Sequence, residues 1–119
     1  MNTESIRNYC LSKKSAEESL PFNETTLVFK VAGKIFALAN LNSQPLRINL
    51  KCEPEKALDL RERFESVRPG YHMNKKHWNT IEVNGEISKE LLINLIDHSY
   101  ELVLEKLPEK VKKIFMLKE

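Results

Sequence analysis

The segment 68–79, Arg-Pro-Gly-Tyr-His-Met-Asn-Lys-Lys-His-Trp-Asn, holds the side chains of this 119-residue chain that are best suited to chemistry. It combines three cationic side chains, two histidines, two aromatic rings and two asparagine amides, and it contains no carboxylate. Arginine and lysine neutralise phosphates, and asparagine amides contact base edges or phosphates. Tyr71 and Trp78 can stack on bases, but a small domain rarely exposes its single tryptophan, so we expect Trp78 in the core. The segment predicts a nucleic-acid-binding surface.

Charge is distributed unevenly along the chain, although the formal net charge is only +2. Residues 25–52 and 66–81 together hold seven of the 19 basic residues and none of the 17 acidic ones. The basic residues in these stretches are Lys30, Lys34, Arg47, Lys51, Arg68, Lys75 and Lys76. Such asymmetry marks interaction surfaces, although strands are also generally poor in Asp and Glu. We favour the interaction surface.

Two histidines of the segment, His72 and His77, raise the question of a metal site. They are separated by four residues, and no cysteine or carboxylate nearby in the sequence completes a set of three or four ligands. We therefore predict no metal ion. A small-ligand or catalytic site built around His72, His77 and Trp78 is the weakest of the functional alternatives.

The motifs of common enzyme classes are missing from the sequence. It contains no nucleophile elbow, no phosphate-binding loop and no zincin helix. Asp97, His98 and Ser99 are consecutive on a predicted helix, where adjacent side chains do not face each other. We predict a protein that is not an enzyme and needs no cofactor.

Length and composition predict one globular domain over residues 1–119, with 41% apolar and 30% charged residues. There is no apolar run of 18 residues and no basic stretch followed by an apolar one at the N-terminus, so we expect neither a membrane span nor secretion. Cys10 and Cys52 form no CxxC pair and are expected to be reduced thiols. A cytoplasmic protein is the expectation.

The pattern of apolar residues places these functional segments on an α+β scaffold. We predict helices over residues 3–14 (capped by Thr3), 54–65 (opened by Pro54), 88–104 (capped by Ser88) and from 108 onward. We predict strands over residues 26–31, 34–39, 46–52 and 77–83, with a short strand within 67–74. Residues 15–23 are predicted to be a loop. The order α-βββ-α-ββ-α-α is typical of two layers, an antiparallel sheet with helices on one face and the other face partly exposed to water.

The hairpin over residues 26–39 has two possible registers. A three-residue loop with Gly33 in the left-handed region would place Lys30 opposite Lys34, and such like charges would favour a visiting anion. A two-residue Ala32-Gly33 turn would pair Val31 with Lys34 and separate the charges. The sequence leaves both registers open.

Six short motifs follow one another along the chain: Phe29-Lys-Val31, Gly33-Lys-Ile-Phe-Ala-Leu38, Leu50-Lys-Cys52, Arg68-Pro-Gly-Tyr-His72, Asn74-Lys-Lys-His-Trp-Asn79 and Leu95-Ile-Asp-His-Ser-Tyr100. In these motifs, and over residues 21–117, the chain resembles the bacterial MmcQ/YjbR family. The resemblance implies a two-layer fold similar to that of type III secretion chaperones. It also implies a DNA-binding "double wing" in which a concave sheet meets nucleic acid.

The leading hypothesis is non-catalytic DNA binding, with few base-specific contacts. The predicted contacts are Lys30, Lys34, Arg47 and Lys51 on the sheet, and Arg68, His72, Asn74, Lys75, Lys76, His77 and Trp78 in the segment. The alternative is a protein- or peptide-interaction module with no nucleic-acid role. Salt dependence separates the two, since phosphate contacts release counterions.

Overall fold

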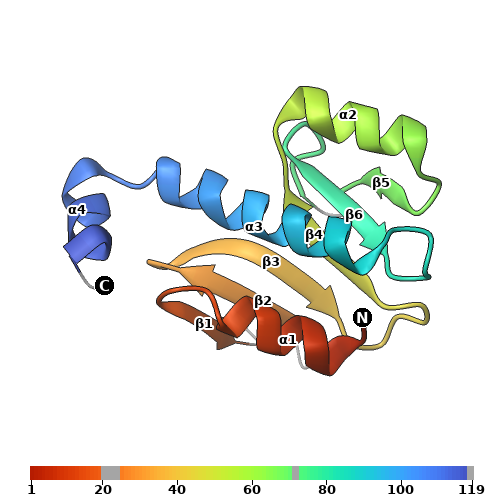
Figure 1. Cartoon of the computed structure of the whole chain (residues 1–119), viewed down its shortest axis with the longest axis horizontal. Helices are drawn as coiled ribbons and strands as arrows, with labels where there is room; N and C mark the ends of the chain where they lie inside the picture. The colour runs from red at the N-terminus through yellow and green to blue at the C-terminus, as the bar shows by residue number, and fades with distance from the viewer. Residues whose placement is uncertain (20–24, 71–72, 118–119) are drawn as a thin grey trace.

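The computed structural model describes residues 1–19, 25–70 and 73–117, which form helices packed on an antiparallel sheet (Figure 1). The helices are α1 (Thr3–Leu11), α2 (Pro54–Arg63), α3 (Lys89–Glu105) and α4 (Glu109–Leu117). The strands are β1 (Ala16–Ser19), β2 (Thr26–Val31), β3 (Lys34–Asn40), β4 (Arg47–Lys51), β5 (Val67–Pro69) and β6 (Trp78–Glu82). Their order in the sheet is β1-β2-β3-β4-β6-β5, and every neighbouring pair is antiparallel. The predicted α+β class is confirmed.

The predicted loop over residues 15–23 was wrong at Ala16–Ser19, which is the edge strand β1. The element order is therefore α-ββββ-α-ββ-α-α. The acidic pair in this segment looks like loop composition, but edge strands commonly carry charges that discourage pairing with other chains. Glu17 lies opposite Lys30 of β2, and Glu18 accepts a hydrogen bond of 2.7 Å from Arg7 Nε of α1. Partners on two other elements hold β1 in place.

The helix ends follow local signals. Asn2, rather than the predicted Thr3, caps α1: its side chain accepts from the Ser5 N–H at 2.8 Å, and the Ser5 hydroxyl accepts from the Asn2 N–H at 2.9 Å. This capping box gives hydrogen-bond partners to two backbone N–H groups, so the helix begins one residue earlier than a Thr3 cap would allow. Pro54 is the first residue of α2 and Ser88 caps α3, as predicted.

The β2–β3 hairpin adopts the two-residue register. Val31 pairs with Lys34, and Lys30 pairs with Ile35. Both turn residues have positive φ, 50° for Ala32 and 77° for Gly33, as a twisted two-residue hairpin turn requires. Lys30 and Lys34 are therefore not opposed across the ladder.

The register shifts between Phe29 and Lys30, and Phe36 is left without a direct partner on β2. The buried Ser99 of α3 compensates for this bulge. Its hydroxyl donates to the Phe36 carbonyl at 2.6 Å and accepts from the Lys51 N–H at 2.8 Å. One side chain therefore ties α3 to both β3 and β4.

Three helices, α1, α2 and α3, pack on one face of the sheet, as predicted. The main core there combines side chains from these helices with the inward side chains of the strands, among them Ile6, Cys10, Phe29, Phe36, Ile48, Leu50, Ala57, Leu60, Leu95 and Ile96. The predicted alternation on β4 is confirmed, because Ile48 and Leu50 are buried whereas Arg47, Asn49 and Lys51 retain exposure. None of the helices in the described part of the chain is long and apolar enough to span a bilayer.

A smaller apolar cluster lies on the opposite face of the sheet. It consists of Val28, Leu38 and Trp78, with Ile35 and Met73 packed against it. The cluster confirms that Trp78 is a packed side chain, with 9% of its surface exposed.

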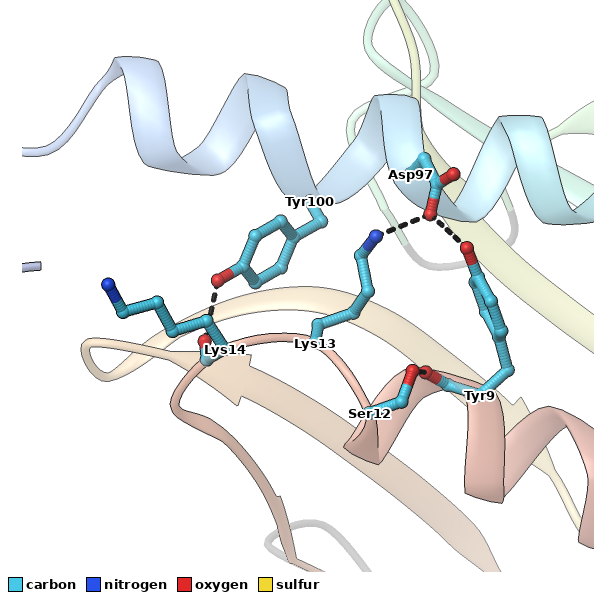
Figure 2. Close-up of polar contacts among 6 residues, drawn as sticks. All are labelled: Tyr9, Ser12, Lys13, Lys14, Asp97 and Tyr100. Atoms are coloured by element: carbon cyan, nitrogen blue, oxygen red, sulfur yellow. Dashed lines mark hydrogen bonds and ion pairs between the residues drawn. The ribbon is translucent and has the colours of Figure 1, made fainter. Parts of the chain in front are cut away.

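A polar network joins α1 to α3 on the helical side (Figure 2). Asp97 Oδ1 accepts hydrogen bonds of 2.5 Å from the Tyr9 hydroxyl and from Lys13 Nζ. The ammonium of Lys13 also lies 5.4 Å from the ring centres of both Tyr9 and Tyr100. The Tyr100 hydroxyl donates to the Lys14 carbonyl at 2.5 Å. Burial and the bond to Asp97 raise the pKa of Tyr9 to about 12.

Candidate anion-binding cleft

Three lysines distant in sequence meet at one cleft beside the hairpin turn. The cleft has a volume of about 520 Å³. Its walls come from the β2–β3 turn, the end of β4, the turn before β6 and the end of α3. The lining residues are Gly33, Lys34, Ile35, Lys51, Met73, Trp78, Val103, Lys106 and Leu107. We call Lys34, Lys51 and Lys106 the lysine cluster.

Regular hydrogen bonding positions the lysine cluster. Lys51 is the last residue of β4 and pairs directly with Trp78 on β6. The bond from the Lys51 N–H to Ser99 fixes this strand end under α3. Lys106 is the C-cap of the same helix, and its N–H donates to the Val103 and Leu104 carbonyls. The end of α3 therefore brings Lys106 to the end of β4.

The floor of the cleft is apolar. Ile35, Met73, Trp78, Val103 and Leu107 line it, and Trp78, Val103 and Leu107 are buried. The cleft thus offers positive charge at its rim and apolar surface below.

Close backbone packing holds Trp78 at this floor. The Gly70 N–H donates to the Trp78 carbonyl at 2.8 Å, and a Cβ on Gly70 would lie only 2.7 Å from Trp78 Cβ. Only glycine allows the two backbones this approach.

The turn that leads into β6 is organised by Asn74. Its side chain accepts from the Lys76 N–H at 2.9 Å, and its carbonyl accepts from the N–H groups of His77 (3.2 Å) and Trp78 (3.0 Å). Arg61 of α2 donates to the carbonyls of Lys75 and Trp78 from behind the turn. The side-chain oxygen of Asn74, predicted to contact DNA, has a structural role in this turn.

Within the described part of the chain, the charged neighbours that perturb His77 are cations. Burial lowers the pKa of His77, and the charges of Lys106, Lys51 and Lys76 lower it further. Burial also lowers the pKa of Lys51, with a contribution from Lys106. Among the described residues, no acidic side chain forms an ion pair with the lysine cluster. Lysines therefore gather at this end of the sheet without a direct acidic partner in the described residues.

The other predicted sheet cations face acids. Glu82 Oε1 lies 3.5 Å from Arg47 Nη2 and 3.7 Å from Arg68 Nη2, at the opposite end of β4 from Lys51. Lys30 lies opposite Glu17 across the β1–β2 ladder. The predicted basic face is therefore divided into a part whose cations have acidic neighbours and the lysine cluster, which has no ion pair among the described residues.

The structure thus brings Lys34, Lys51, His77 and Trp78 together, with Lys76 near enough to affect His77. It places Lys30, Arg47 and Arg68 elsewhere. His72 lies outside the described residues. Lys106 was missed by sequence reasoning, because nothing in its neighbourhood along the chain marks it as functional. Its position after the long buried helix predicted only a helix end.

The described residues contain no group of three His, Cys, Asp or Glu side chains arranged to hold a metal ion. The two cysteines, Cys10 and Cys52, are buried free thiols. Burial raises the pKa of Cys10 to about 12 and also raises that of Cys52. High thiol pKa values disfavour the thiolate that a nucleophile or a metal ligand needs.

Sequence and structure comparisons agree on one family. A family model described as YjbR matches residues 11–102. The uncharacterised protein YbdF of Escherichia coli O157:H7 is 40% identical over 111 residues, which cover 92% of this chain and 90% of YbdF. The uncharacterised protein YjbR of Escherichia coli K12 is 31% identical over 116 residues, or 98% of each chain.

Solved structures give the same result. The Deinococcus radiodurans protein DR2400, described as a DUF419 domain, has a TM-score of 0.92 and 37% identity, over 96% of this chain and 87% of its own. A Pseudomonas syringae protein has a TM-score of 0.75 and 28% identity, over 86% of this chain and 98% of its own. The names of these relatives state no activity or ligand. With a family match over most of its length and relatives aligned nearly end to end, this chain belongs to the YjbR family.

Proposed function

We propose that this protein is a non-catalytic, cytoplasmic DNA-binding protein whose phosphate contacts centre on the lysine cluster. One observation supports this most directly: Lys34, Lys51 and Lys106 line one cleft, and no acidic side chain of the described residues forms an ion pair with them. Amino groups gathered without carboxylates attract a polyanion, because each phosphate contact releases condensed counterions. The raised pKa values of the two buried thiols argue against catalysis by a cysteine nucleophile.

In this proposal, DNA phosphates contact only the end of the predicted basic face that holds the lysine cluster, and not the whole face. Lys34, Lys51, Lys76 and Lys106 contact phosphates, while Glu82 weakens the contribution of Arg47 and Arg68. Phosphate contacts position a protein on DNA without reading its sequence. We therefore expect similar affinities for unrelated duplexes.

The test is the salt dependence of duplex binding, measured by fluorescence anisotropy. The double variant Lys34→Gln/Lys106→Gln should flatten the slope of log affinity against log salt by about two, at about 0.9 per phosphate contact. The single variant Lys106→Gln should flatten the slope by about one, and Lys89→Gln is its matched control, because it also removes one positive charge but at the other end of α3, about 25 Å away along a 17-residue helix. Equal slopes for the double variant and wild type, or no duplex binding even at low salt, would refute the proposal.

Protein or peptide interaction is the second candidate function. The observation that favours it is Ile114 of α4, a large apolar side chain that is 49% exposed. An apolar contact of this kind depends little on salt. A partner whose binding is lost in Ile114→Ser, but unchanged between 0.05 and about 0.5 M salt, would support this function over DNA binding.

A further inference from the structure

We infer that the cleft beside the lysine cluster binds a nucleoside phosphate, with the phosphate at the lysines and the base on the apolar floor. The inference deepens the proposed function, because an unpaired nucleotide of DNA is one source of this ligand. A free nucleotide is the other source, and the experiment below separates the two.

The charge of the rim selects the phosphate. The lysine cluster brings three ammonium groups from three different elements to one cleft, and none of the described lining residues is acidic. Lys51 is half-buried, and the nearby charge of Lys106 makes its protonated form less favourable. An anion between Lys51 and Lys106 would relieve their mutual repulsion. A phosphate carries up to two negative charges and several acceptor oxygens, so it can contact more than one lysine at once.

The floor selects a flat apolar group joined to that phosphate. The five apolar floor residues line the same cleft as the lysine cluster, and the cleft volume of about 520 Å³ is in the range of small-molecule sites. Nucleobases gain binding energy from aromatic and apolar surfaces regardless of their sequence. A single carboxylate or inorganic phosphate would use the rim and leave this floor uncovered.

A base inside a duplex cannot reach such a floor, because it is stacked between its neighbours and paired. The cleft therefore favours an unpaired nucleotide, such as one in a single-stranded overhang. Blunt duplex DNA would contact the lysines through its backbone only. The cleft therefore predicts tighter binding of DNA with an unpaired overhang than of blunt duplex DNA, a difference that phosphate contacts by themselves do not produce.

The single tryptophan of the chain provides a local readout, because Trp78 is part of the floor. Three probes are titrated against the full chain: deoxyadenosine monophosphate, a blunt duplex, and the same duplex with a four-adenine overhang. We expect the mononucleotide and the overhang to change Trp78 fluorescence. We also expect the overhang duplex to bind about tenfold more tightly than the blunt one, the effect of one well-placed base.

The variant Met73→Glu places a carboxylate in the floor, and Met73→Leu is its apolar control. Met73→Glu should abolish the fluorescence change and the overhang preference, while Met73→Leu retains both. Circular dichroism and thermal unfolding check that each variant is folded. If Met73→Glu does not fold, Lys51→Gln against the control Lys89→Gln tests the rim in the same way.

The possible failures are distinguishable. Blunt and overhang duplexes that bind equally, with silent fluorescence from all three probes, would overturn the nucleotide site and leave backbone binding intact. Mononucleotide binding with no affinity for either duplex would support the cleft and overturn the DNA-binding function.

Discussion

Lys51 and Trp78 are direct partners across the β4–β6 ladder, and both line the cleft at the C-terminal end of α3. This pairing places an ammonium group beside the aromatic floor of the cleft. The two residues are 27 positions apart, and their contact depends on the antiparallel register between β4 and β6. The site therefore depends on the same ladder that stabilises the sheet.

Glu82→Gln should strengthen duplex binding. The carboxylate of Glu82 lies near both Arg47 and Arg68, and its removal releases two guanidinium groups for phosphate contacts. We expect the slope of log affinity against log salt to steepen by up to about two. The exposed Glu62→Gln on α2 removes an equal charge away from these arginines and serves as the control. Weaker duplex binding by Glu82→Gln would contradict the claim that Glu82 limits phosphate contacts by Arg47 and Arg68.

Gly70→Ala should destabilise the fold by about 1–3 kcal/mol, the usual cost of forcing extra atoms into packed structure. The new Cβ would lie 2.7 Å from Trp78 Cβ and 3.0 Å from the Trp78 carbonyl oxygen, so the backbone must move. Urea unfolding measures the loss, and a shifted Trp78 emission maximum locates it. The exposed Lys75→Ala in the following turn should stay within about 0.5 kcal/mol of wild type. A Gly70→Ala variant with wild-type stability and unchanged emission would show that there is room for a Cβ between Gly70 and Trp78.

Ser99→Ala should cost about 1–3 kcal/mol, because it leaves the Phe36 carbonyl and the Lys51 N–H without their shared partner. Chemical denaturation gives the free energy of unfolding. Ser19→Ala on the exposed edge strand β1 is the comparison and should be nearly neutral. Equal stability of the two variants would mean that other groups hydrogen-bond to the Phe36 carbonyl and the Lys51 N–H when Ser99 is replaced.

Tyr9→Phe should reduce the loss of stability at alkaline pH. The pKa of Tyr9 is about 12 in the folded protein and about 10 in an unfolded chain, so the folded state holds the phenolic proton more tightly. The resulting stabilisation is complete below about pH 10 and is lost as the pH rises toward 12. Subtracting the Tyr9→Phe unfolding free energies from wild type between pH 8 and about 11 isolates this contribution. A difference that does not change with pH would contradict the raised pKa of Tyr9, which burial and the hydrogen bond to Asp97 produce together.

Zinc and iron should bind no more tightly than they bind to exposed histidines. His72 and His77 are too few to complete a tetrahedral set. Native mass spectrometry after incubation with each metal measures the stoichiometry. One metal ion per chain, lost on His72→Ala, would prove this prediction wrong.

Local signals in the sequence determined most of the secondary structure. Ser88 caps α3 because a hydroxyl can accept from a nearby backbone N–H, and Pro54 opens α2 because its missing N–H costs nothing there. The alternation of residues 46–52 determined which side chains of β4 are buried. The motifs also carried the resemblance to the family that the comparisons confirm.

Only the tertiary structure decided how the charges combine. The short strand β1 exists because β2 pairs with it, although its own composition resembles a loop. The β4–β6 register, together with the end of β5, brings Arg47 and Arg68 to Glu82, whereas the end of α3 brings Lys106 to Lys51. Coulomb interactions depend on distance in space, which a linear count of charges does not contain. The sequence therefore predicted a basic protein face, and packing decided which of its cations have an acidic partner.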